Sequence, residues 1–502
     1  MASSTPESPG LARGAIGLRE VLFQSVTHMA PAAAVAFSIP AGASYAAGAL
    51  PLATVLALIA CIFVALSIGE LARHLPSAGS FYTYASQGIH PWMGFLVAWA
   101  YAFAEAFIAA FLFLVFAITV SGTLNTEYGW STGTWWIWVV LSSLLVFVLG
   151  YLGIQISTEA GTIMGVFEII VFGALAVWLI VEAGSRNSLS VFTTQHATVQ
   201  GYAGFSGVIA ACVYSILAFT GFESSAPLAE EARDPRRTIR KAVIYSALAI
   251  GAFYVFTTYA ATVYRGPNHM TDFVKLGNGD PWTFLARAVW GVGWLLVFIA
   301  IINSAVANAN AGANATTRTW FAMGRIRLLP AFMATIHPRF KSPHIAVIVQ
   351  FVVALVLALW LGFQYTPYTA FILMATIFTL ILISIYIVIL IACIAYYWRF
   401  QRQHANILMH GIIPILGIAV FVPVFLTAAG IPAFKFVGKL AYPISLAGPV
   451  VGVWMVLGIV YLIYLNSRHP DRLAETGRIF FDESPAMPVG GADSGDSALS
   501  ER

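Results

Sequence analysis

Three glutamates inside apolar stretches are the residues of this sequence that could do chemistry. Glu105, Glu168 and Glu223 each lie well inside a run of mostly apolar residues, and no Lys or Arg lies at comparable depth. An ionised side chain at the centre of a membrane helix costs roughly 2.5–3.5 kcal/mol, so such residues usually face a protein interior or a wet pathway. Each carboxyl alone could be protonated or satisfied by a nearby Ser, Thr or backbone group. Together they indicate that at least one meets a cation: a substrate ammonium, a proton or Na⁺.

Two weaker polar signals accompany the glutamates. His28 lies near the end of a helical segment, where it could serve coupling or gating, or could be a hydrogen-bonded structural residue. A later apolar run contains four amides within twelve residues, which are Asn303, Asn308, Asn310 and Asn314. Four amides cannot all face lipid cheaply, so part of that helix must face protein or water.

The composition fixes the environment in which these groups must be positioned. Of the 502 residues, 60% are hydrophobic and only 9% are charged, against roughly 25% charged residues in an ordinary soluble domain. We therefore expect an all-α integral membrane protein. A helix needs about 20 mostly apolar residues to cross a bilayer, and about twelve such runs are present. They are 18–48, 50–72, 91–120, 133–152, 155–183, 205–231, 241–264, 287–324, 343–363, 366–398, 408–430 and 441–466.

The positive charges test this count, because cytoplasmic loops collect Lys and Arg. With both termini in the cytoplasm, nineteen of the 25 Lys and Arg residues fall inside. The six outside are Arg186, Arg265, Lys275, Arg287, Lys435 and Lys439. An even number of spans in the plasma (inner) membrane, with both ends cytoplasmic, is therefore predicted.

The chain divides into one membrane domain and two tails. Residues 1–14 and 467–502 are rich in Ser, Pro and Gly or in polar residues, and we expect two cytoplasmic tails that are largely disordered. The domain between them covers residues 15–466 and is expected to contact the lipid bilayer.

Several classes of function lack their sequence signals. The net charge of +4 is confined to a few loops, which speaks against a nucleic-acid partner, and the three cysteines lie apart inside apolar stretches. We find no HExxH, GxSxG or GxxxxGK[ST] pattern, so neither a hydrolase nor an ATP-driven pump is indicated. No metal site and no cofactor are expected. A multi-pass channel or receptor is the alternative that the helix count alone leaves open.

Two of the predicted spans contain helix-breaking residues. The first contains Pro31 and Pro40, and the sixth contains Gly221 beside polar residues. Secondary transporters place broken helices at corresponding positions of two inverted halves, where the helix ends form a site near the bilayer midplane. Simple kinks without a function are the alternative for either helix alone.

Three groups of motifs resemble the amino acid–polyamine–organocation permeases. The first comprises 219–223 (FTGFE), 228–231 (LAEE) and 234–237 (DPRR); the second 69–71 (GEL) and 75–82 (LPSAGSFY); the third 314–318 (NATTR), 323–325 (MGR) and 328–330 (LLP). The similarity runs over roughly residues 15–466.

The resemblance implies a LeuT-like five-plus-five inverted repeat with discontinuous helices 1 and 6. The repeats would cover about 18–183 and 205–398, with two extra helices at about 408–466. It also implies a central substrate site, with Phe219 as an aromatic lid. The residues implied at this site are Ala32, Ala33, Ala34, Val35, Ala218, Phe219, Thr220 and Gly221. Glu223 belongs to the family pattern and would stabilise the broken sixth helix, with gating as a second role.

The sequence departs from the family pattern in two places. A glycine-rich stretch of the first helix reads Ala33-Ala34-Val35 here, where each Cβ hinders a close approach of a carboxylate to the backbone. Glu168 stands where proton-coupled relatives often have a Lys in the fifth span, so it could titrate as the coupling group or help to hold a cation. With Glu105 added to the substrate site, these departures favour amines: a cationic amino acid, a polyamine or a small amino alcohol.

The sequence thus predicts a secondary active transporter and not an enzyme. It would move amino acids or related amines by alternating access, coupled to H⁺ or else to Na⁺, and an exchanger of amines or amino acids is the alternative within this class.

Overall fold

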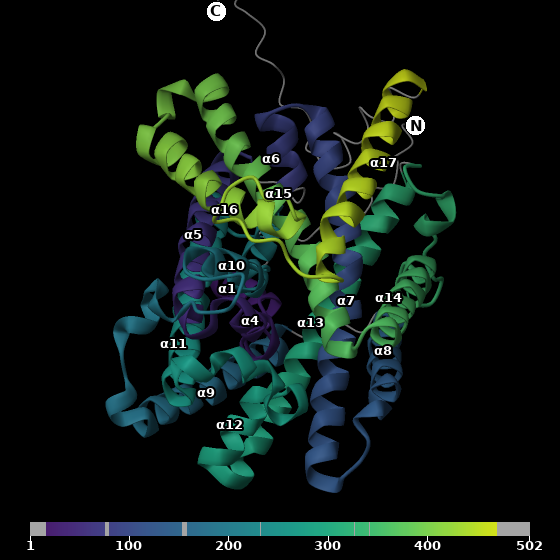
Figure 1. The fold of residues 1–502 in the computed structure, drawn as a ribbon. Helices are drawn as coiled ribbons and strands as arrows, with labels where there is room; N and C mark the ends of the chain where they lie inside the picture. The colour runs from purple at the N-terminus through teal and green to yellow at the C-terminus, as the bar shows by residue number, and fades with distance from the viewer. Residues whose placement is uncertain are drawn as a thin grey trace, which may run out of the picture.

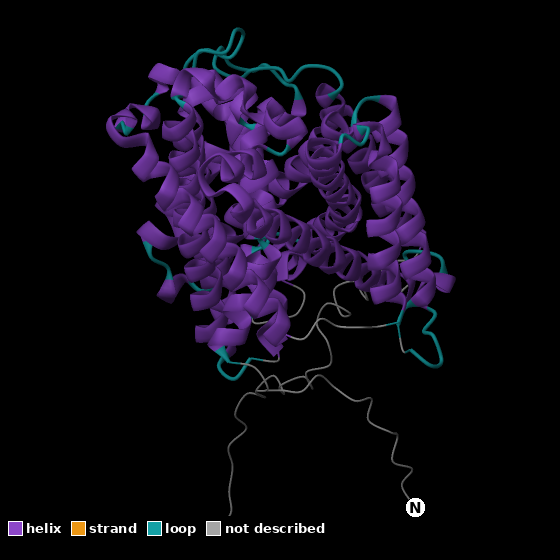
Figure 2. Ribbon diagram, turned by 90° about the horizontal axis from the view of Figure 1, so that it is seen from below, coloured by secondary structure: helices purple, strands orange, loops and turns teal. Residues whose placement is uncertain are grey.

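The computed structural model describes residues 17–75, 80–152, 158–230, 232–325, 327–340 and 342–468. Within these ranges the chain is helical and contains no β-strand (Figure 2). The tail predicted at 1–14 lies outside the described residues, as does the tail predicted at 467–502 from residue 469 onward.

Long helices account for most of the predicted spans. They are α5 (Leu50–His74), α7 (Pro91–Tyr128), α8 (Trp135–Tyr151), α9 (Thr158–Ala183), α11 (Pro235–Arg265), α13 (Trp294–Arg325), α14 (His344–Gln364), α15 (Pro367–Phe400), α16 (Ile413–Ala429) and α17 (Ala447–Arg468). Shorter elements connect them, among them α6 (Ser80–Gly88), the 3₁₀ segment Pro267–Gly279 and α12 (Pro281–Trp290). The predicted spans agree with these helices to within a few residues at most ends.

The first and sixth predicted spans are each divided. The first consists of α1 (Leu18–His28), a short helix α2 (Pro31–Ala33), a π-helical turn (Ala34–Ser38), α3 (Ile39–Ala41) and α4 (Ala43–Ala46). The sixth consists of α10 (Phe205–Phe219) and a 3₁₀ segment, Phe222–Glu230.

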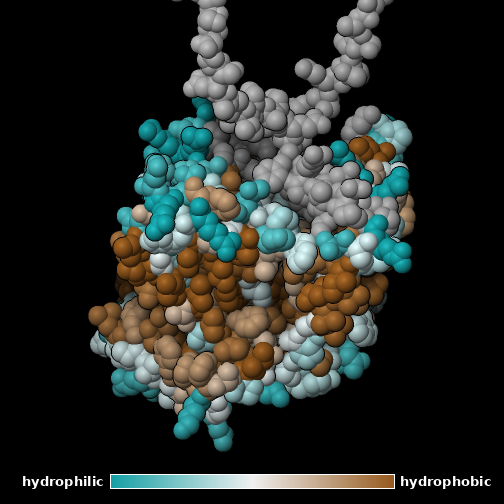
Figure 3. All heavy atoms as spheres, turned by 90° about the horizontal axis from the view of Figure 1, so that it is seen from above, coloured by the Kyte–Doolittle hydropathy of each residue, from teal (hydrophilic) through white to brown (hydrophobic). Residues whose placement is uncertain are grey.

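Eleven stretches of the described chain are long and apolar enough to cross a membrane. The first of them, Leu18–His74, extends over 57 residues, far beyond the roughly 20 that one crossing needs. It holds the first two predicted spans, so the structure agrees with the expected count of about twelve. On the face drawn in Figure 3, a band of apolar side chains lies between two hydrophilic zones, as a lipid-facing belt would.

Pairs of helices that are distant in the sequence pack side by side. α5 lies against α11, α7 against α13 and α15, and α8 against α14, with the last pair at the right-hand edge of Figure 1. α8, α9, α14 and α17 keep large apolar side chains exposed, for example Leu144, Ile170, Trp360 and Val453. These helices therefore form the outer layer, and the broken helices lie inside it.

Glu70 on α5 connects four helical segments at one end of the bundle. Its carboxylate lies 3.1 Å from Arg73 and 3.0 Å from Arg240 of α11. His410, in the turn before α16, places Nε2 3.4 Å from the same carboxylate, and Tyr397 of α15 donates to the Glu70 backbone carbonyl at 2.9 Å. The His410 and Tyr397 rings are stacked, with their centroids 3.4 Å apart.

Two tryptophans join α7 to α17. Trp99 Nε1 donates to the Trp454 carbonyl at 3.0 Å, and Trp454 Nε1 donates to the Trp99 carbonyl at 3.2 Å. Their rings stack with centroids 4.5 Å apart. The two half-buried indole N–H groups are thus both paired.

Candidate functional site

The first helix breaks between His28 and Pro31. Ala30 adopts a left-handed conformation, with φ of 46° and ψ of 66°, and Pro31 then begins the second half of the helix. Proline suits the first helical position because it has no N–H to lose and its φ is already helical. The predicted break is therefore present, and it lies just before Pro31 and not along the segment up to Pro40.

The sixth helix breaks at Thr220 and Gly221. Thr220 is extended, with ψ of 132°, and Gly221 has φ of +115°, a conformation that L side chains rarely adopt. A Cβ on Gly221 would lie 2.8 Å from the backbone C and O atoms of His28. The two broken segments therefore touch, and His28 lies at their contact.

Carbonyls around the breaks are capped by side chains. Ser25 donates to the Phe222 carbonyl at 2.8 Å, and Tyr254 of α11 donates to the Met29 carbonyl at 2.9 Å. These bonds supply partners that an interrupted helix cannot provide for itself.

Glu168 of α9 connects the break in the first helix to α13. Its Oε2 accepts the backbone N–H of Ala32 at 3.2 Å, and its Oε1 accepts from Asn303 Nδ2 at 2.7 Å. Next to it, the Ala33 N–H donates to Ser304 Oγ at 3.1 Å. Glu168 is 3% exposed, so a single buried carboxyl contacts two elements that could move relative to each other.

Glu223 has the corresponding place at the break in the sixth helix. Its Oε2 accepts the Gly221 N–H at 3.0 Å and its Oε1 accepts from Tyr386 of α15 at 3.0 Å. Each broken helix thus has one of its freed amides bonded to a glutamate of the same chain, which the helix-terminus dipole also favours.

Glu105 of α7 lies near the break in the sixth helix, within electrostatic range of Glu223. It is 2% exposed and interacts with Tyr101, one turn earlier on the same helix. Its Oε2 has no hydrogen-bond partner among the described residues. It is not among the residues that line the cavity described next.

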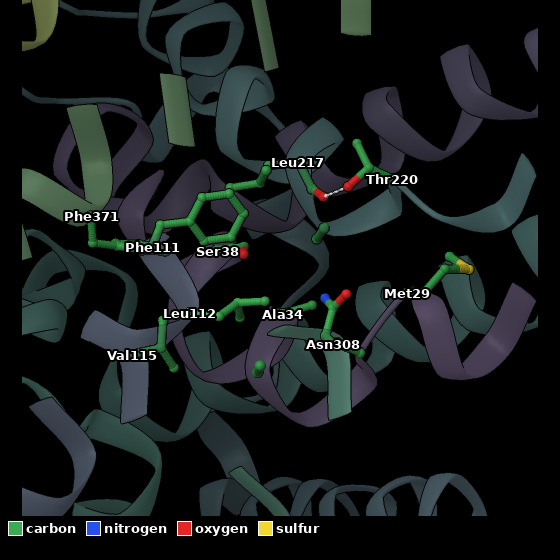
Figure 4. A pocket seen from close by; sticks show the side chains of 13 residues that line it. Met29, Ala34, Ser38, Phe111, Leu112, Val115, Leu217, Thr220, Asn308 and Phe371 are labelled. Atoms are coloured by element: carbon green, nitrogen blue, oxygen red, sulfur yellow. Dashed lines mark hydrogen bonds between the residues drawn. The ribbon is translucent and has the colours of Figure 1, made fainter. Parts of the chain in front are cut away.

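A small cavity of about 30 Å³ lies between the two breaks. It is lined by Met29, Ala30, Ala33, Ala34, Ser38, Phe111, Leu112, Val115, Leu217, Ala218, Thr220, Asn308 and Phe371. Figure 4 shows the Asn308 amide entering it from α13, opposite the Thr220 hydroxyl, which donates to the Leu217 carbonyl. None of the lining residues is charged.

Four of the residues expected at the substrate site line this cavity: Ala33, Ala34, Ala218 and Thr220. Ala32, Val35 and Gly221 are close in sequence but do not line it.

Phe219, the expected lid, points elsewhere. Its ring packs edge-on against Tyr254, with centroids 5.4 Å apart. It fills the space beside Gly251, where a Cβ would lie 2.7 Å from the Phe219 ring.

The aromatic walls come instead from Phe111 of α7 and Phe371 of α15, whose rings contact each other edge-on. Sequence reasoning singled out neither ring. Asn308 was noticed only as one of four amides, and that cluster was the available signal.

Comparison with known proteins decides the class of this molecule. The sequence model described as "Amino acid permease" matches residues 20–469. The chain belongs to the amino acid permease family. This permease therefore has the family's all-α fold of about twelve membrane helices, a LeuT-like inverted repeat with discontinuous helices 1 and 6.

Three relatives of this permease are named for different substrates. The low-affinity putrescine importer PlaP of Escherichia coli K12 is 24% identical over 423 residues, which is 83% of this chain and 85% of the relative. The branched-chain amino acid permease BcaP of Bacillus subtilis 168 is 26% identical over 61% of this chain and 66% of the relative. The serine/threonine exchanger SteT of the same organism is 24% identical over 59% and 64%.

These findings establish the general class of function. The permease is a multi-pass membrane transporter and not an enzyme, and its relatives are named for amino acids and an amine.

Proposed function

We propose that this permease is a secondary active transporter that moves a small amino acid or amine by alternating access, with Glu168 as the group that takes up and releases a proton. The observation that carries the proposal is the position of Glu168. It is a buried carboxyl bonded at once to the Ala32 amide and to Asn303.

Proton uptake by Glu168 would change these contacts directly. An ionised carboxylate accepts hydrogen bonds on both oxygens, whereas a protonated carboxyl has one O–H that must donate. Protonation therefore weakens either the bond from Ala32 or the bond from Asn303, and a change of this kind can bias the first helix between two arrangements. Na⁺ at the same carboxylate is the alternative coupling ion.

Glu223 and His28 are proposed as gating residues. Glu223 joins the sixth-helix break to α15 through Tyr386, and His28 packs against Gly221. Movement of the sixth helix would rearrange both contacts, and movement of the first helix would rearrange the contact between His28 and Gly221. The substrate would lie in the cavity between the breaks, among Ala33, Ala34, Ala218 and Thr220, with Ala32, Val35 and Gly221 next to these residues in the chain.

The test is uptake by the purified permease in proteoliposomes with an imposed pH gradient. We expect the wild-type protein to accumulate substrate in response to an inward proton gradient. The Glu168→Gln variant keeps the size of the side chain but cannot titrate, so its uptake should lose the response to pH. Glu182→Gln is the matched control, because Glu182 lies exposed near the end of the same helix.

Two outcomes would overturn the assignment. Unchanged pH dependence in Glu168→Gln would remove Glu168 from coupling. Accumulation that is driven by a Na⁺ gradient and does not respond to a proton gradient would identify Na⁺, and not H⁺, as the coupling ion.

Exchange is a second candidate, favoured by the similarity to the serine/threonine exchanger. It predicts that uptake requires substrate inside the liposomes. Equal uptake into empty and preloaded liposomes would reject it.

We also propose an inner-membrane location with both termini in the cytoplasm. The distribution of Lys and Arg described above supports this orientation. The proposed units are the repeats at about 18–183 and 205–398 and the extra helices at about 408–466. Accessibility of tags fused to the two ends, in spheroplasts and in inverted vesicles, tests the orientation.

A further inference from the structure

We propose that the substrate is an amine that carries no carboxylate. This inference rests on the proposed transport function and narrows its substrate class. Its basis is that oxygen atoms of the chain itself already accept hydrogen bonds from most of the backbone amides at the two breaks. These amides belong to Ala32, Ala33, Ala34, Thr220, Gly221 and Ser224.

After the break in the first membrane helix, each N–H group of residues 31–34 already has a hydrogen-bond acceptor within the chain. Pro31 has none, Ala32 donates to Glu168, and Ala33 donates to Ser304. Ala34 donates to the Ala30 carbonyl at 2.9 Å. A substrate carboxylate would need such donors, and it would find them taken.

Three amides at the break in the sixth helix are occupied in the same way. Thr220 N–H donates to the Leu217 carbonyl at 3.2 Å, and Gly221 N–H donates to Glu223. Ser224 N–H donates to the Gly221 carbonyl at 3.0 Å. At each break a glutamate, Glu168 or Glu223, accepts the hydrogen bond that the backbone could otherwise donate to an anionic group of a ligand.

The charges around the cavity also disfavour an anionic group. No Lys or Arg is among its 13 lining residues, so a bound carboxylate would be buried without a cation, which is costly. Glu168 and Glu223 contact the same broken segments and would repel it. An ammonium group is attracted by both glutamates for the same reason.

The cavity offers acceptors and apolar surface to such an amine. Asn308 Oδ1 is buried and has no hydrogen-bond partner among the described residues, and Figure 4 shows the amide directed into the cavity. The Thr220 hydroxyl donates to Leu217 and keeps lone pairs for accepting. The rings of Phe111 and Phe371 can pack on the apolar body of the substrate and attract its charge.

The experiment compares pairs of compounds that differ only by the carboxylate. The pairs are valine with isobutylamine, serine with ethanolamine, and ornithine with putrescine. Each compound is tested for thermal stabilisation of the purified permease, because a ligand of the folded state raises its apparent stability, and for uptake into proteoliposomes. We expect at least one amine to stabilise the protein and to be taken up, at concentrations at least ten-fold below those of its amino acid.

The outcomes separate this inference from the transport proposal. An amino acid that stabilises the protein as well as its amine or better, or a panel in which nothing stabilises it, overturns the inference. Stabilisation by an amine without any uptake supports the inference and contradicts the proposed transport.

Two variants test the geometry on the same panel. Asn308→Ala should weaken binding of the amine by about ten-fold or more, since a hydrogen bond to a charged group is lost. Asn310→Ala is the matched control, because Asn310 is buried on the same helix but does not line the cavity. Glu168→Ala frees the Ala32 amide and should raise the affinity for the amino acids relative to the amines; no change in this ratio would contradict the proposed blockade.

Discussion

At the scale of single residues, the site depends on carboxyls that hold the ends of interrupted helices. Glu168 was found from sequence because an acid inside an apolar run is costly and therefore noticeable. Phe111 and Phe371 were missed because aromatic residues abound in every span, and only packing decides which of them face inward. The direction of Phe219 could not be foreseen either, since it depends on the space beside Gly251, far along the chain.

Gly221 provides a prediction at this scale. Its φ of +115° and its contact with the His28 backbone leave no room for a side chain. Gly221→Ala should therefore lower stability by about 1–3 kcal/mol, seen as a lower melting temperature in detergent. Gly173→Ala on α9 is the control, because nothing lies within 4 Å of its Cβ position. Equal melting temperatures for the two variants would show that the conformation of Gly221 is not required.

At the scale of elements, the sequence predicted the helices better than their breaks. Runs of about 20 apolar residues mark spans reliably, because backbone groups inside a bilayer must be paired within the helix. Pro31 and Pro40 correctly indicated which helix is broken, but neither proline is itself the point of the break, because each lies at the start of a short helix. Pro31 begins one helix, and Pro40 follows a π-helical turn at the start of another. The residue with a left-handed conformation at the break is Ala30, and an alanine gives no sequence signal for such a conformation.

The contacts of Glu70 predict that the packing of four helical segments depends on one carboxyl group, and that its removal lowers the stability of the protein. Glu70→Ala leaves His410, which is 3% exposed, and part of Arg240 without an acceptor. An unsatisfied buried donor costs about 1–3 kcal/mol, so the melting temperature should fall. The comparison is Asp272→Ala, which breaks the exposed pair with Lys275 and should leave stability unchanged. A similar fall in both variants would mean that the buried cluster contributes no more than a surface pair.

At the scale of the whole molecule, the space between the two breaks is too small for a substrate. The cavity of about 30 Å³ has room for about two water molecules, less than any amine in the panel needs. Transport therefore requires the bundle to open around the breaks. The family and the spans follow from the sequence because they depend on motifs and composition. The size of the cavity depends on how side chains pack, and it could not be predicted in that way.

Opening can be followed by thiol labelling. The three cysteines, Cys61, Cys212 and Cys393, are buried, so a Ser38→Cys variant adds a thiol at the cavity wall. We expect a water-soluble thiol reagent to react slowly with this variant at rest and faster during transport. The control is Ser188→Cys in an exposed loop, which should react at once in both conditions. Equally fast reaction of the two variants at rest would mean that the cavity is already open.

The paired tryptophans also set a condition on how the protein is made. Trp99 and Trp454 are separated by 355 residues, and at about 5–20 residues per second a ribosome needs roughly 20–70 s to pass from one to the other. During this time α7 exists without the partner that accepts the hydrogen bond of its Trp99 indole. The contact between α7 and α17 can therefore form only after the last membrane helix has been synthesised.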